Sequence, residues 1–348
     1  MKKAIIVGWI NKGKIPDCGE TVKNQLMIKR LQNLGVKCYQ CDFKNWKKHP
    51  WVLLKLLFCL IFHHEATLIL STSAINIYSF LKTLKRIGWK QNIVHWVIGG
   101  TLGDNVEQGI FDASVIGYAN HTLVESTLMV QKLGVKKIAG VKQVPNFKLI
   151  TYIPEIKKKY PGNNQKLRLV FMSRIMQEKG CDYITEAAKA LNSQNFQNAF
   201  SIDFYGKIAN DYEKKFLKNI EDIPNVHYRG FLNLNDNSSY DTLSEYDLML
   251  FPTYWEGEGF AGVFIDSFVA GVPLLASDWA HNRCFLKEGK NTIFIKPHDV
   301  NGIITEIRNC INGVYDLDEM ARRSQNEASK YDVNKVISSE LLSEIGVF

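Results

Sequence analysis

The sequence has no long hydrophobic run and no histidine spacing typical of a metal site. No apolar stretch approaches the roughly 18 residues that a bilayer-crossing helix requires. The eight histidines include no HxxxH or HExxH pair, so a structural zinc site has no support. The opening residues 1–8 are too short in apolar content for a signal peptide and indicate a first strand.

Cysteine is sparse, and its number is odd. Seven cysteines in a chain without an export signal are typical of a reducing compartment, so we expect the protein in the cytoplasm. Cys38 and Cys41 form an isolated C-x-x-C pair on a predicted strand. Because no second pair completes a metal site, core packing is the preferred interpretation.

Length and charge indicate two unlike halves. At about 150 residues per domain, 348 residues predict two domains. The composition is 46% hydrophobic and 22% charged, which allows each domain a core. Residues 1–160 carry a formal charge of +15 and residues 161–348 carry −7. This asymmetry predicts a polyanionic partner on one side, or a solvated lysine-rich face.

Strand and helix patterns alternate along both halves, which predicts two α/β domains with parallel sheets. The expected domains cover residues 1–155 and 165–330, with a linker at 150–165 that contains two prolines and three consecutive lysines. Expected strands are 4–9, 36–43, 66–71, 92–98, 167–173, 200–205, 226–229, 248–252 and 274–276; expected helices include 21–33, 182–191 and 331–345.

The strongest motif is a glycine-rich loop between a strand that ends at Pro252 and a helix that begins near Ala261. Free N–H groups at that helix start would face the carboxyl edge of the sheet, where open α/β sheets bind ligands. Glu258 and Asp266 would reach the same edge, and carboxylates there suit hydroxyl-rich ligands. The alternative is an acidic surface loop that caps a helix.

A second motif, Arg174-x4-Lys179-Gly180, follows the first predicted strand of the second domain. Two cations at a strand's carboxyl end can neutralise a diphosphate, with the guanidinium binding in bidentate fashion and the lysine acting as a point charge. Alone this pattern is weak, since any exposed loop could contain it. Together with the acidic loop of the same domain it is much stronger.

These motifs resemble those of retaining GT-B glycosyltransferases of the family 4 type, the glycosyl transferases group 1, over nearly the whole chain. The resemblance also includes Asp203–Gly206, Asn225–Gly230, Gly19 before the first helix, Glu125-Ser126 at a helix start and Val144–Asn146. It implies an α/β GT-B fold of two Rossmann-like domains facing across a cleft. The first domain would bind the acceptor and the second the nucleotide-sugar donor. A C-terminal helix, 331–348, would pack back on the first domain.

The resemblance also implies roles for residues. Arg174 and Lys179 would contact the diphosphate and Glu258 the hydroxyls of the transferred sugar, and these three residues would be the catalytic residues. Asp266 would bind the ribose, although glutamate is usual there. The other implied donor-binding residues are Gly19, Gly206, Gly230 beside the base, Phe260, Ala261 (where glycine is usual), Gly262 and Val263. Glu256 is a rival to Glu258, but eight residues after it stands Phe264 rather than an acid.

Breaking the anomeric C–O bond leaves a diphosphate whose growing negative charge needs nearby cations. Arg174, Lys179 and a helix N-terminus would supply this stabilisation, so we expect no metal or other cofactor. The only D-x-D triplet, Asp316–Asp318, stands where a late helix begins and is better explained by capping. Retention of configuration is implied by the family. The donor would be a UDP- or GDP-sugar, which the motifs do not distinguish.

The acceptor side is less defined. A loop at 11–18 and the turn with Gly99 and Gly100 after a predicted strand are candidates for acceptor contacts. His95 lies inside that strand, where core packing is preferred over catalysis, and His121 is equally open.

The basic half contains a lysine-rich lead-in and an apolar helix at 44–62. Such a segment suits contact with anionic lipid on the inner face of the cell membrane, and the alternative is a buried core helix with a solvated lysine rim. We therefore expect transfer to a lipid-linked or saccharide acceptor in cell-surface polysaccharide or lipopolysaccharide biosynthesis. A same-fold epimerase is one alternative. A nucleic-acid-binding protein is another, but no aromatic RNA-binding signature accompanies the lysines, so no nucleic-acid partner is expected.

Overall fold

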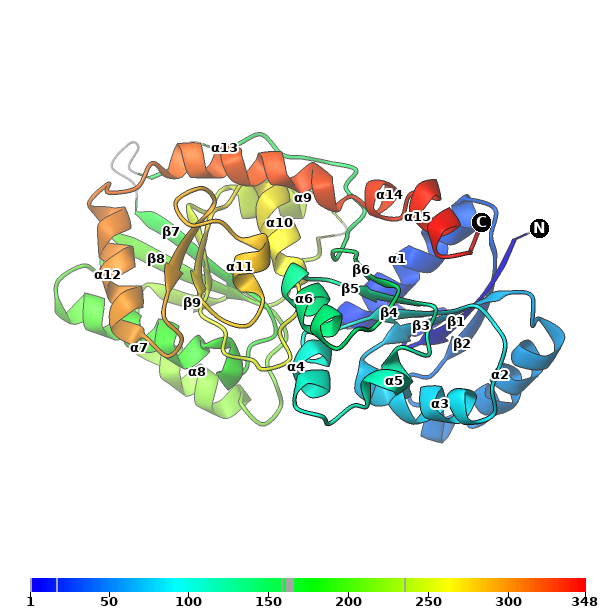
Figure 1. The fold of residues 1–348 in the computed structure, drawn as a ribbon. Helices are drawn as coiled ribbons and strands as arrows, with labels where there is room; N and C mark the ends of the chain where they lie inside the picture. Colours follow the sequence, from blue (N-terminus) through cyan, green and yellow to red (C-terminus); the bar gives the residue numbers. More distant parts are fainter. Residues whose placement is uncertain (1, 17, 158, 161–165, 235) are drawn as a thin grey trace. The chain divides into compact units, whose positions relative to one another are not determined.

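The computed structural model describes residues 2–16, 18–157, 159–160, 166–234 and 236–348. Lys158 and residues 161–165, which the sequence analysis assigns to the linker, lie outside the described residues. The chain forms two compact units, Met1–Leu149 with Lys330–Phe348, and Ile150–Ser329. Each unit contains a six-stranded parallel sheet covered by helices on both faces, which confirms the predicted α/β class (Figure 1).

The first sheet has the order β2-β1-β3-β4-β5-β6. Its alternating side chains serve two cores: Ala4 and Ile6 face one side, and Ile5 and Val7 the other. Helices α1, α14 and α15 cover the first side and α2, α3 and α5 the second (Figure 1). The elements of this unit before its C-terminal segment are β1 Lys3–Gly8, α1 Gly19–Asn33, β2 Lys37–Asp42, the 3-10 turn η1 Trp46–Lys48, α2 Trp51–Phe62, β3 Thr67–Thr72, α3 Ala74–Arg86, β4 Ile93–Val97, α4 Leu102–Glu107, α5 Ala113–Ile116, β5 His121–Val124, α6 Thr127–Val135 and β6 Val141–Gln143.

The C-terminal segment corrects one prediction. Instead of a single helix over 331–345, the chain forms a turn, η3 Ser329–Tyr331, and two short helices, α14 Val333–Val336 and α15 Ser339–Glu344. The helix is interrupted because the Ser338 side chain accepts a hydrogen bond from the Leu341 N–H and starts a new helix. The segment packs on the first unit, where Arg30 donates to the carbonyl of Ile337 at 3.1 Å.

The second sheet has the order β12-β11-β10-β7-β8-β9, again all parallel. Helices α7, α8 and α12 cover one face and α9, α10 and α13 the other (Figure 1). Its elements are β7 Leu167–Met172, the turn η2 Gln177–Lys179, α7 Cys181–Ser193, β8 Phe200–Tyr205, α8 Glu213–Glu221, β9 Val226–Tyr228, α9 Asn237–Ser244, β10 Leu248–Phe251, α10 Gly262–Ala270, β11 Leu274–Ser277, α11 Asn282–Phe285, β12 Thr292–Ile295, α12 Val300–Ile311 and α13 Leu317–Ala328.

Each sheet has one point at which the strand order reverses. In the first sheet it lies between β1 and β3, and in the second between β7 and β10. The loops that follow two such neighbouring strands lead in opposite directions, which leaves a crevice at the carboxyl edge. Ligands of open α/β sheets bind in this crevice, so these two edges are the places to look for function. No described helix combines the length and the apolar content that a membrane crossing requires.

Candidate functional site

A buried ion pair lies at the reversal point of the second sheet. Lys179 ends η2, after β7, and its ammonium group pairs with the carboxylate of Glu258, in the loop after β10. The two side chains are only 12% and 8% exposed. The Thr253 hydroxyl donates to the same carboxylate oxygen, Oε2, at 3.1 Å. The structure therefore brings together the cation of one predicted motif and the acid of the other.

Gly180 holds the two loops in contact. Its φ of +76° is unfavourable for a side chain, and a Cβ there would lie 2.2 Å from the carbonyl oxygen of Pro252, at the end of β10. The backbone N–H of Tyr254 also donates to the Glu178 carbonyl at 2.9 Å. The motif therefore needs a glycine after Lys179 for a steric reason, which the spacing of the motif did not reveal.

Arg174 differs from Lys179 in its surroundings. It follows β7, is exposed, and forms no ion pair with any residue that the structure describes. A guanidinium held at the carboxyl edge without an internal partner is available to an anionic ligand. Glu256, the rival to Glu258, is exposed and stays apart from the ion pair.

The two predicted glycines after β8 and β9 lie against the loop that carries Arg174. Gly206 donates its N–H to the carbonyl of Gly230 at 2.7 Å. A Cβ on Gly206 would lie 1.8 Å from the Ser173 carbonyl oxygen, at a φ of +141° that side chains rarely adopt. Only glycine lets these segments approach so closely, so Gly206, Gly230 and Arg174 share one stretch of the carboxyl edge.

The start of α10 presents backbone amides. Ala261 is the N-cap residue and offers no side-chain hydrogen bond, so the N–H groups of the first turn, with Gly262 and Val263, have no side-chain cap. Phe260 is buried just before it and stacks on Phe285, with 4.0 Å between ring centroids. This packing fixes the position at which the helix begins.

Asp266 lies on α10 and is 3% exposed. Tyr240 of α9 donates to its Oδ1 at 2.9 Å, and burial together with this carboxylate raises the pKa of the tyrosine. Sequence reasoning missed Tyr240, because nothing in the helical pattern 26 residues upstream marks it as the partner of an acid. Two hydrogen bonds to Asp203 were also missed. Arg229, which precedes Gly230, donates to it at 3.0 Å, and Tyr246 donates to it at 2.7 Å.

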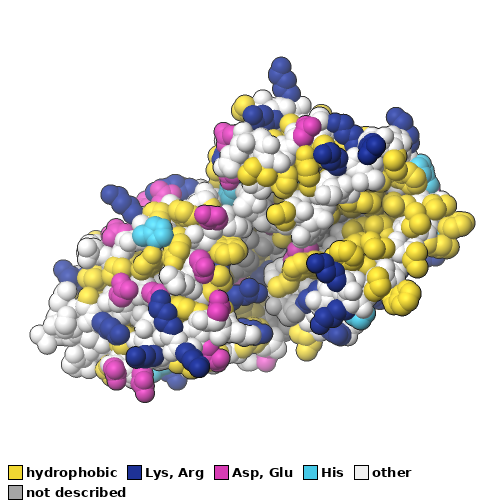
Figure 2. All heavy atoms as spheres, turned by 90° about the horizontal axis from the view of Figure 1, so that it is seen from below, with side chains coloured by type: hydrophobic (Ala, Val, Ile, Leu, Met, Phe, Trp, Pro, Cys, Tyr) yellow, Lys and Arg dark blue, Asp and Glu magenta, His cyan; other side chains and the backbone are white. Residues whose placement is uncertain are grey.

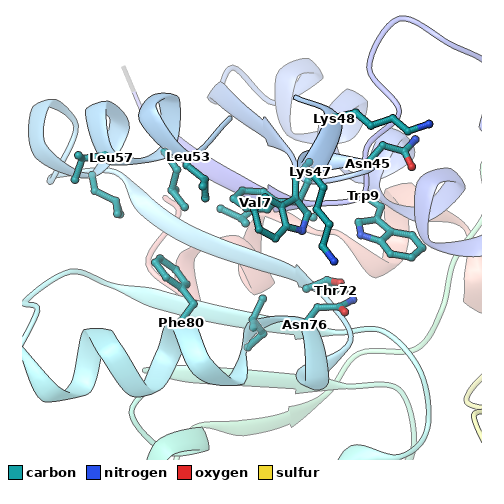
Figure 3. A pocket seen from close by; sticks show the side chains of 16 residues that line it. Val7, Trp9, Asn45, Lys47, Lys48, Leu53, Leu57, Thr72, Asn76 and Phe80 are labelled. Carbon is teal, nitrogen blue, oxygen red and sulfur yellow. Dashed lines mark hydrogen bonds between the residues drawn. The ribbon is translucent and has the colours of Figure 1, made fainter. Parts of the chain in front are cut away.

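The carboxyl edge of the first sheet has a different character. At its reversal point lies a pocket of about 640 Å³, between the ends of β1 and β3 and the helices α2 and α3 (Figure 3). Val7, Gly8 and Thr72 contribute the strand ends. Gly19 begins α1 in this first unit, whereas the other predicted donor-binding residues belong to the second unit. A Cβ on Gly19 would meet no atom within 4 Å.

The two candidate histidines do not face this edge. His95 is fully buried in the middle of β4, its Nε2 lies 3.4 Å from the Thr72 carbonyl oxygen, and burial lowers its pKa to about 4. This is the geometry of core packing, which the sequence analysis preferred. His121 is the first residue of β5 and so lies at the amino end of the sheet. Gly99, with a φ of +97°, and Gly100 form the turn after β4.

A second buried ion pair lies beside β5. Glu125 follows this strand and pairs with Lys23 of α1 at 2.8 Å, with side chains 5% and 4% exposed. Ser126 accepts a hydrogen bond from the Met129 N–H at 3.1 Å and caps α6, so the predicted helix start is confirmed. Lys23 was missed because its partner lies 102 residues away in the sequence.

Two further interpretations are settled by the structure. Asp316 of the D-x-D triplet caps α13 by accepting from the Glu319 N–H at 2.8 Å, and Asp318 accepts from the Lys159 N–H at 2.7 Å. Cys38 and Cys41 are both free thiols, and burial raises the pKa of each to about 12. Asp316 therefore serves as a cap, Asp318 binds the backbone of Lys159, and the thiols lie in packed surroundings.

Comparison with known proteins agrees with this geometry. Residues 166–313 match the family model of the glycosyl transferases group 1. No curated protein sequence matches the chain. Among solved structures, the chain resembles the lipopolysaccharide outer core galactosyltransferase WaaB, with a TM-score of 0.68 at 15% identity over 97% of both chains.

Two other structures are similar at the level of the fold. Anabaena HepE in complex with UDP has a TM-score of 0.69 at 14% identity, covering 99% of both chains. Sucrose-phosphate synthase from Thermosynechococcus elongatus has a TM-score of 0.70 at 12% identity over 95% of both chains. The second unit of this chain thus carries a glycosyl transferases group 1 domain, and the chain is a glycosyltransferase with the two-domain GT-B fold.

Proposed function

We propose that this enzyme is a retaining glycosyltransferase that moves a sugar from a nucleoside-diphosphate donor to a lipid-linked or saccharide acceptor. The observation that carries the proposal is the arrangement at the reversal point of the second sheet. There Lys179 is buried against Glu258, while Arg174 is exposed and pairs with no anion among the described residues. One cation orients an acid and the other is left for the ligand.

The leaving diphosphate would be stabilised by charge. As the anomeric C–O bond breaks, its electron pair passes to the diphosphate oxygen, and Arg174 and Lys179 face the developing charge. The backbone amides from Phe260 to Val263 at the start of α10 add positive potential in the same sense. These groups supply the electrostatic stabilisation from the protein itself, so the proposed mechanism includes no metal.

Glu258 would orient the transferred sugar. The carboxylate of Glu258 accepts hydrogen bonds from Lys179 and Thr253, and both reach the oxygen Oε2. No described residue donates to Oε1, which is therefore open to a sugar hydroxyl. The ion pair fixes the carboxylate so that little side-chain freedom is lost when the sugar binds.

The nucleotide would lie along the remaining predicted residues. Asp266 would bind the ribose hydroxyls alongside Tyr240, and Gly206 and Gly230 would border the base. HepE, which shares the fold, has been solved with UDP and with UDP-glucose, which supports a uridine nucleotide as the first donor to test.

The first unit would bind the acceptor and touch an anionic membrane. The outer side of α2 exposes large apolar side chains, and lysines precede the helix. Figure 2 shows hydrophobic side chains gathered at the right, with lysine and arginine among them. The residues concerned are Trp51, Leu54, Phe58, Ile61 and Phe62, with Lys44, Lys47 and Lys48. This pattern suits cell-surface polysaccharide or lipopolysaccharide assembly at the inner face of the membrane.

A thermal-shift screen tests the donor. UDP, GDP, UDP-glucose and GDP-mannose are added to the wild type and to Arg174→Ala. We expect at least one nucleotide to stabilise the wild type and to stabilise the variant much less. No stabilisation by any nucleotide, or equal stabilisation of both proteins, contradicts the proposal. A sugar whose configuration changes without any acceptor would identify an epimerase instead.

A further inference from the structure

The pocket of the first unit has one strongly apolar end. Leu53 and Leu57 line it from α2, and Phe80 lines it from α3 on the opposite side (Figure 3). Its volume of about 640 Å³ falls within the range of small-molecule sites. Because it lies at the reversal point of the sheet, it occupies the place at which such folds bind their ligands.

Helix α2 is apolar nearly all round, although only one side of it is in the core. Val52, Leu56, Cys59 and Leu60 are buried, and Lys55 is its only charged residue. The side chains of Leu53 and Leu57, between the core side and the outer side, are left 45% and 54% exposed. Exposed apolar surface on this scale marks an interaction site, so we expect an apolar ligand in the pocket.

The opposite end of the pocket is cationic and polar. Lys47 points into it toward Thr72 and Asn76, whereas Lys48 points away (Figure 3). Asn76 donates to the Thr72 hydroxyl at 3.0 Å, and none of the described residues that line the pocket is acidic. Among the described lining residues, Lys47 is therefore the inward cation and no carboxylate faces it. The carboxylate of Glu20, outside the lining, is hydrogen-bonded to Thr72.

We propose that this pocket binds the hydrocarbon chain of a lipid-linked acceptor, with the phosphate that follows the chain held by Lys47. The inference rests on the proposed function, because it decides between the two acceptor classes given there. A free saccharide would leave its hydroxyls without partners against Leu53, Leu57 and Phe80, which is costly. A chain that ends in a phosphate matches both ends of the pocket.

The outer side of the same helix supplies a route for such a ligand. Trp51, Leu54 and Phe58 are 72%, 64% and 54% exposed and continue the apolar surface beyond the pocket. With this side on an anionic bilayer, a lipid could enter the pocket along α2 without its chain crossing water. The ligand source is thus a membrane lipid rather than a free phosphate.

Dodecyl phosphate, used below its micelle concentration, is a suitable probe. Calorimetric titration of the full chain should show saturable binding, with no binding of inorganic phosphate and weaker binding of dodecyl maltoside. Leu57→Gln and Leu53→Gln should each weaken the binding about tenfold, because each removes a leucine side chain that the bound hydrocarbon chain would cover. Lys47→Ala should weaken the binding of dodecyl phosphate but leave that of dodecyl maltoside unchanged.

Leu54→Gln is the matched control, because Leu54 lies on the same helix, is 64% exposed and does not line the pocket. It should change the affinity for dodecyl phosphate by less than about twofold. Equal losses in Leu54→Gln and Leu57→Gln would show adhesion to the outer side of α2 and overturn the proposal. Absence of binding to the wild type would overturn it as well.

The same samples separate this inference from the proposed function. UDP binding, measured in parallel, should be unchanged in the α2 variants, and their circular dichroism spectra should match that of the wild type, which shows that the first unit is folded. A wild type that binds UDP but not dodecyl phosphate removes only the lipid pocket. One that binds dodecyl phosphate but no nucleotide removes only the proposed donor.

Discussion

The two sheets share one topology and differ in the chemistry at their reversal points. The second sheet places an ion pair, an exposed arginine and close-packed glycines there. The first sheet places an apolar pocket with a single inward lysine there. Since parallel sheets expose only loops at the carboxyl edge, the strands fix the place of a site and the loops fix what it binds.

Both edges depend on glycines that permit close backbone contact. In the first sheet a Cβ on Gly8 would lie 2.2 Å from the Ser71 carbonyl oxygen. In the second, Gly180 and Gly206 meet Pro252 and Ser173 in the same way. Both edges therefore share the close packing of glycines against backbone carbonyls. They differ in the charged and apolar side chains around these glycines.

The largest expected effect comes from Gly206→Ala. The new Cβ would lie 1.8 Å from a backbone carbonyl oxygen at a φ of +141°, so the loops after β7 and β8 must separate. We expect a loss of about 5 kcal/mol or more in the free energy of unfolding of the second unit. Circular dichroism during thermal unfolding measures it. Gly19→Ala, with no atom within 4 Å, is the control and should unfold like the wild type.

Next comes the removal of one charge from each buried ion pair. Glu258→Gln and Glu125→Gln leave Lys179 and Lys23 buried without their anions, at a cost of about 3 kcal/mol each. Their functional effects should differ. Glu258→Gln should lower transferase activity about 100-fold or more, because the sugar loses its oriented acceptor of hydrogen bonds. Glu125→Gln should keep nucleotide binding. A loss of transferase activity in Glu125→Gln as large as in Glu258→Gln would contradict the assignment.

A smaller effect is expected from pH on the first unit. The pKa of His95 is about 4 in the folded protein, against the ordinary value of 6.5, so the unfolded chain binds the proton more tightly. The stability from the neutral histidine is complete above pH 6.5 and declines as the pH falls toward 4. At pH 5 the decline is about 2 kcal/mol. In urea unfolding at pH 7 and pH 5, His95→Leu should lose less stability than the wild type; equal losses would contradict this account.

The smallest effect on stability is expected from Arg174→Ala. The side chain is exposed and forms no ion pair with a described residue, so the free energy of unfolding should change by less than about 0.5 kcal/mol. Nucleotide affinity should nevertheless fall at least tenfold, because a bidentate contact to the diphosphate is lost. A large drop in the unfolding temperature would mean that Arg174 has a structural role instead.

Anionic vesicles test the outer side of α2. The variant Lys48→Glu changes the lysine that points away from the pocket, and it should float with phosphatidylglycerol vesicles less than the wild type, since each basic residue near the surface contributes about 1 kcal/mol. Zwitterionic vesicles should bind both proteins weakly. Equal flotation of the two proteins with anionic vesicles would remove the membrane contact.

The second edge could be predicted from the sequence more fully than the first. Its residues lie in two short motifs, Arg174–Gly180 and Phe251–Asp266, each of which follows a strand, and β8 covers the residues 200–205 that were predicted. The pocket of the first unit joins residues from 7 to 80 that share no motif. The exposure of the outer side of α2 could not be predicted either, because a helix that is apolar nearly all round also fits a buried core.

The partners of buried acids were missed for a related reason. Tyr240 reaches Asp266 and Lys23 reaches Glu125 only because packed helices bring them together. A local pattern records the acid and the helix, but not the neighbour across the fold. The break between α14 and α15 is different, since Ser338 was a readable N-cap signal inside the expected helix.

The central claim is that the two edges bind different ligand classes, and one calorimetric experiment tests it directly. UDP and dodecyl phosphate are each titrated into the wild type, Arg174→Ala and Leu57→Gln. We predict that Arg174→Ala weakens only UDP binding and that Leu57→Gln weakens only dodecyl phosphate binding. The account would be contradicted by a variant that weakens the binding of both ligands equally. It would also be contradicted if neither variant weakened the binding of either ligand.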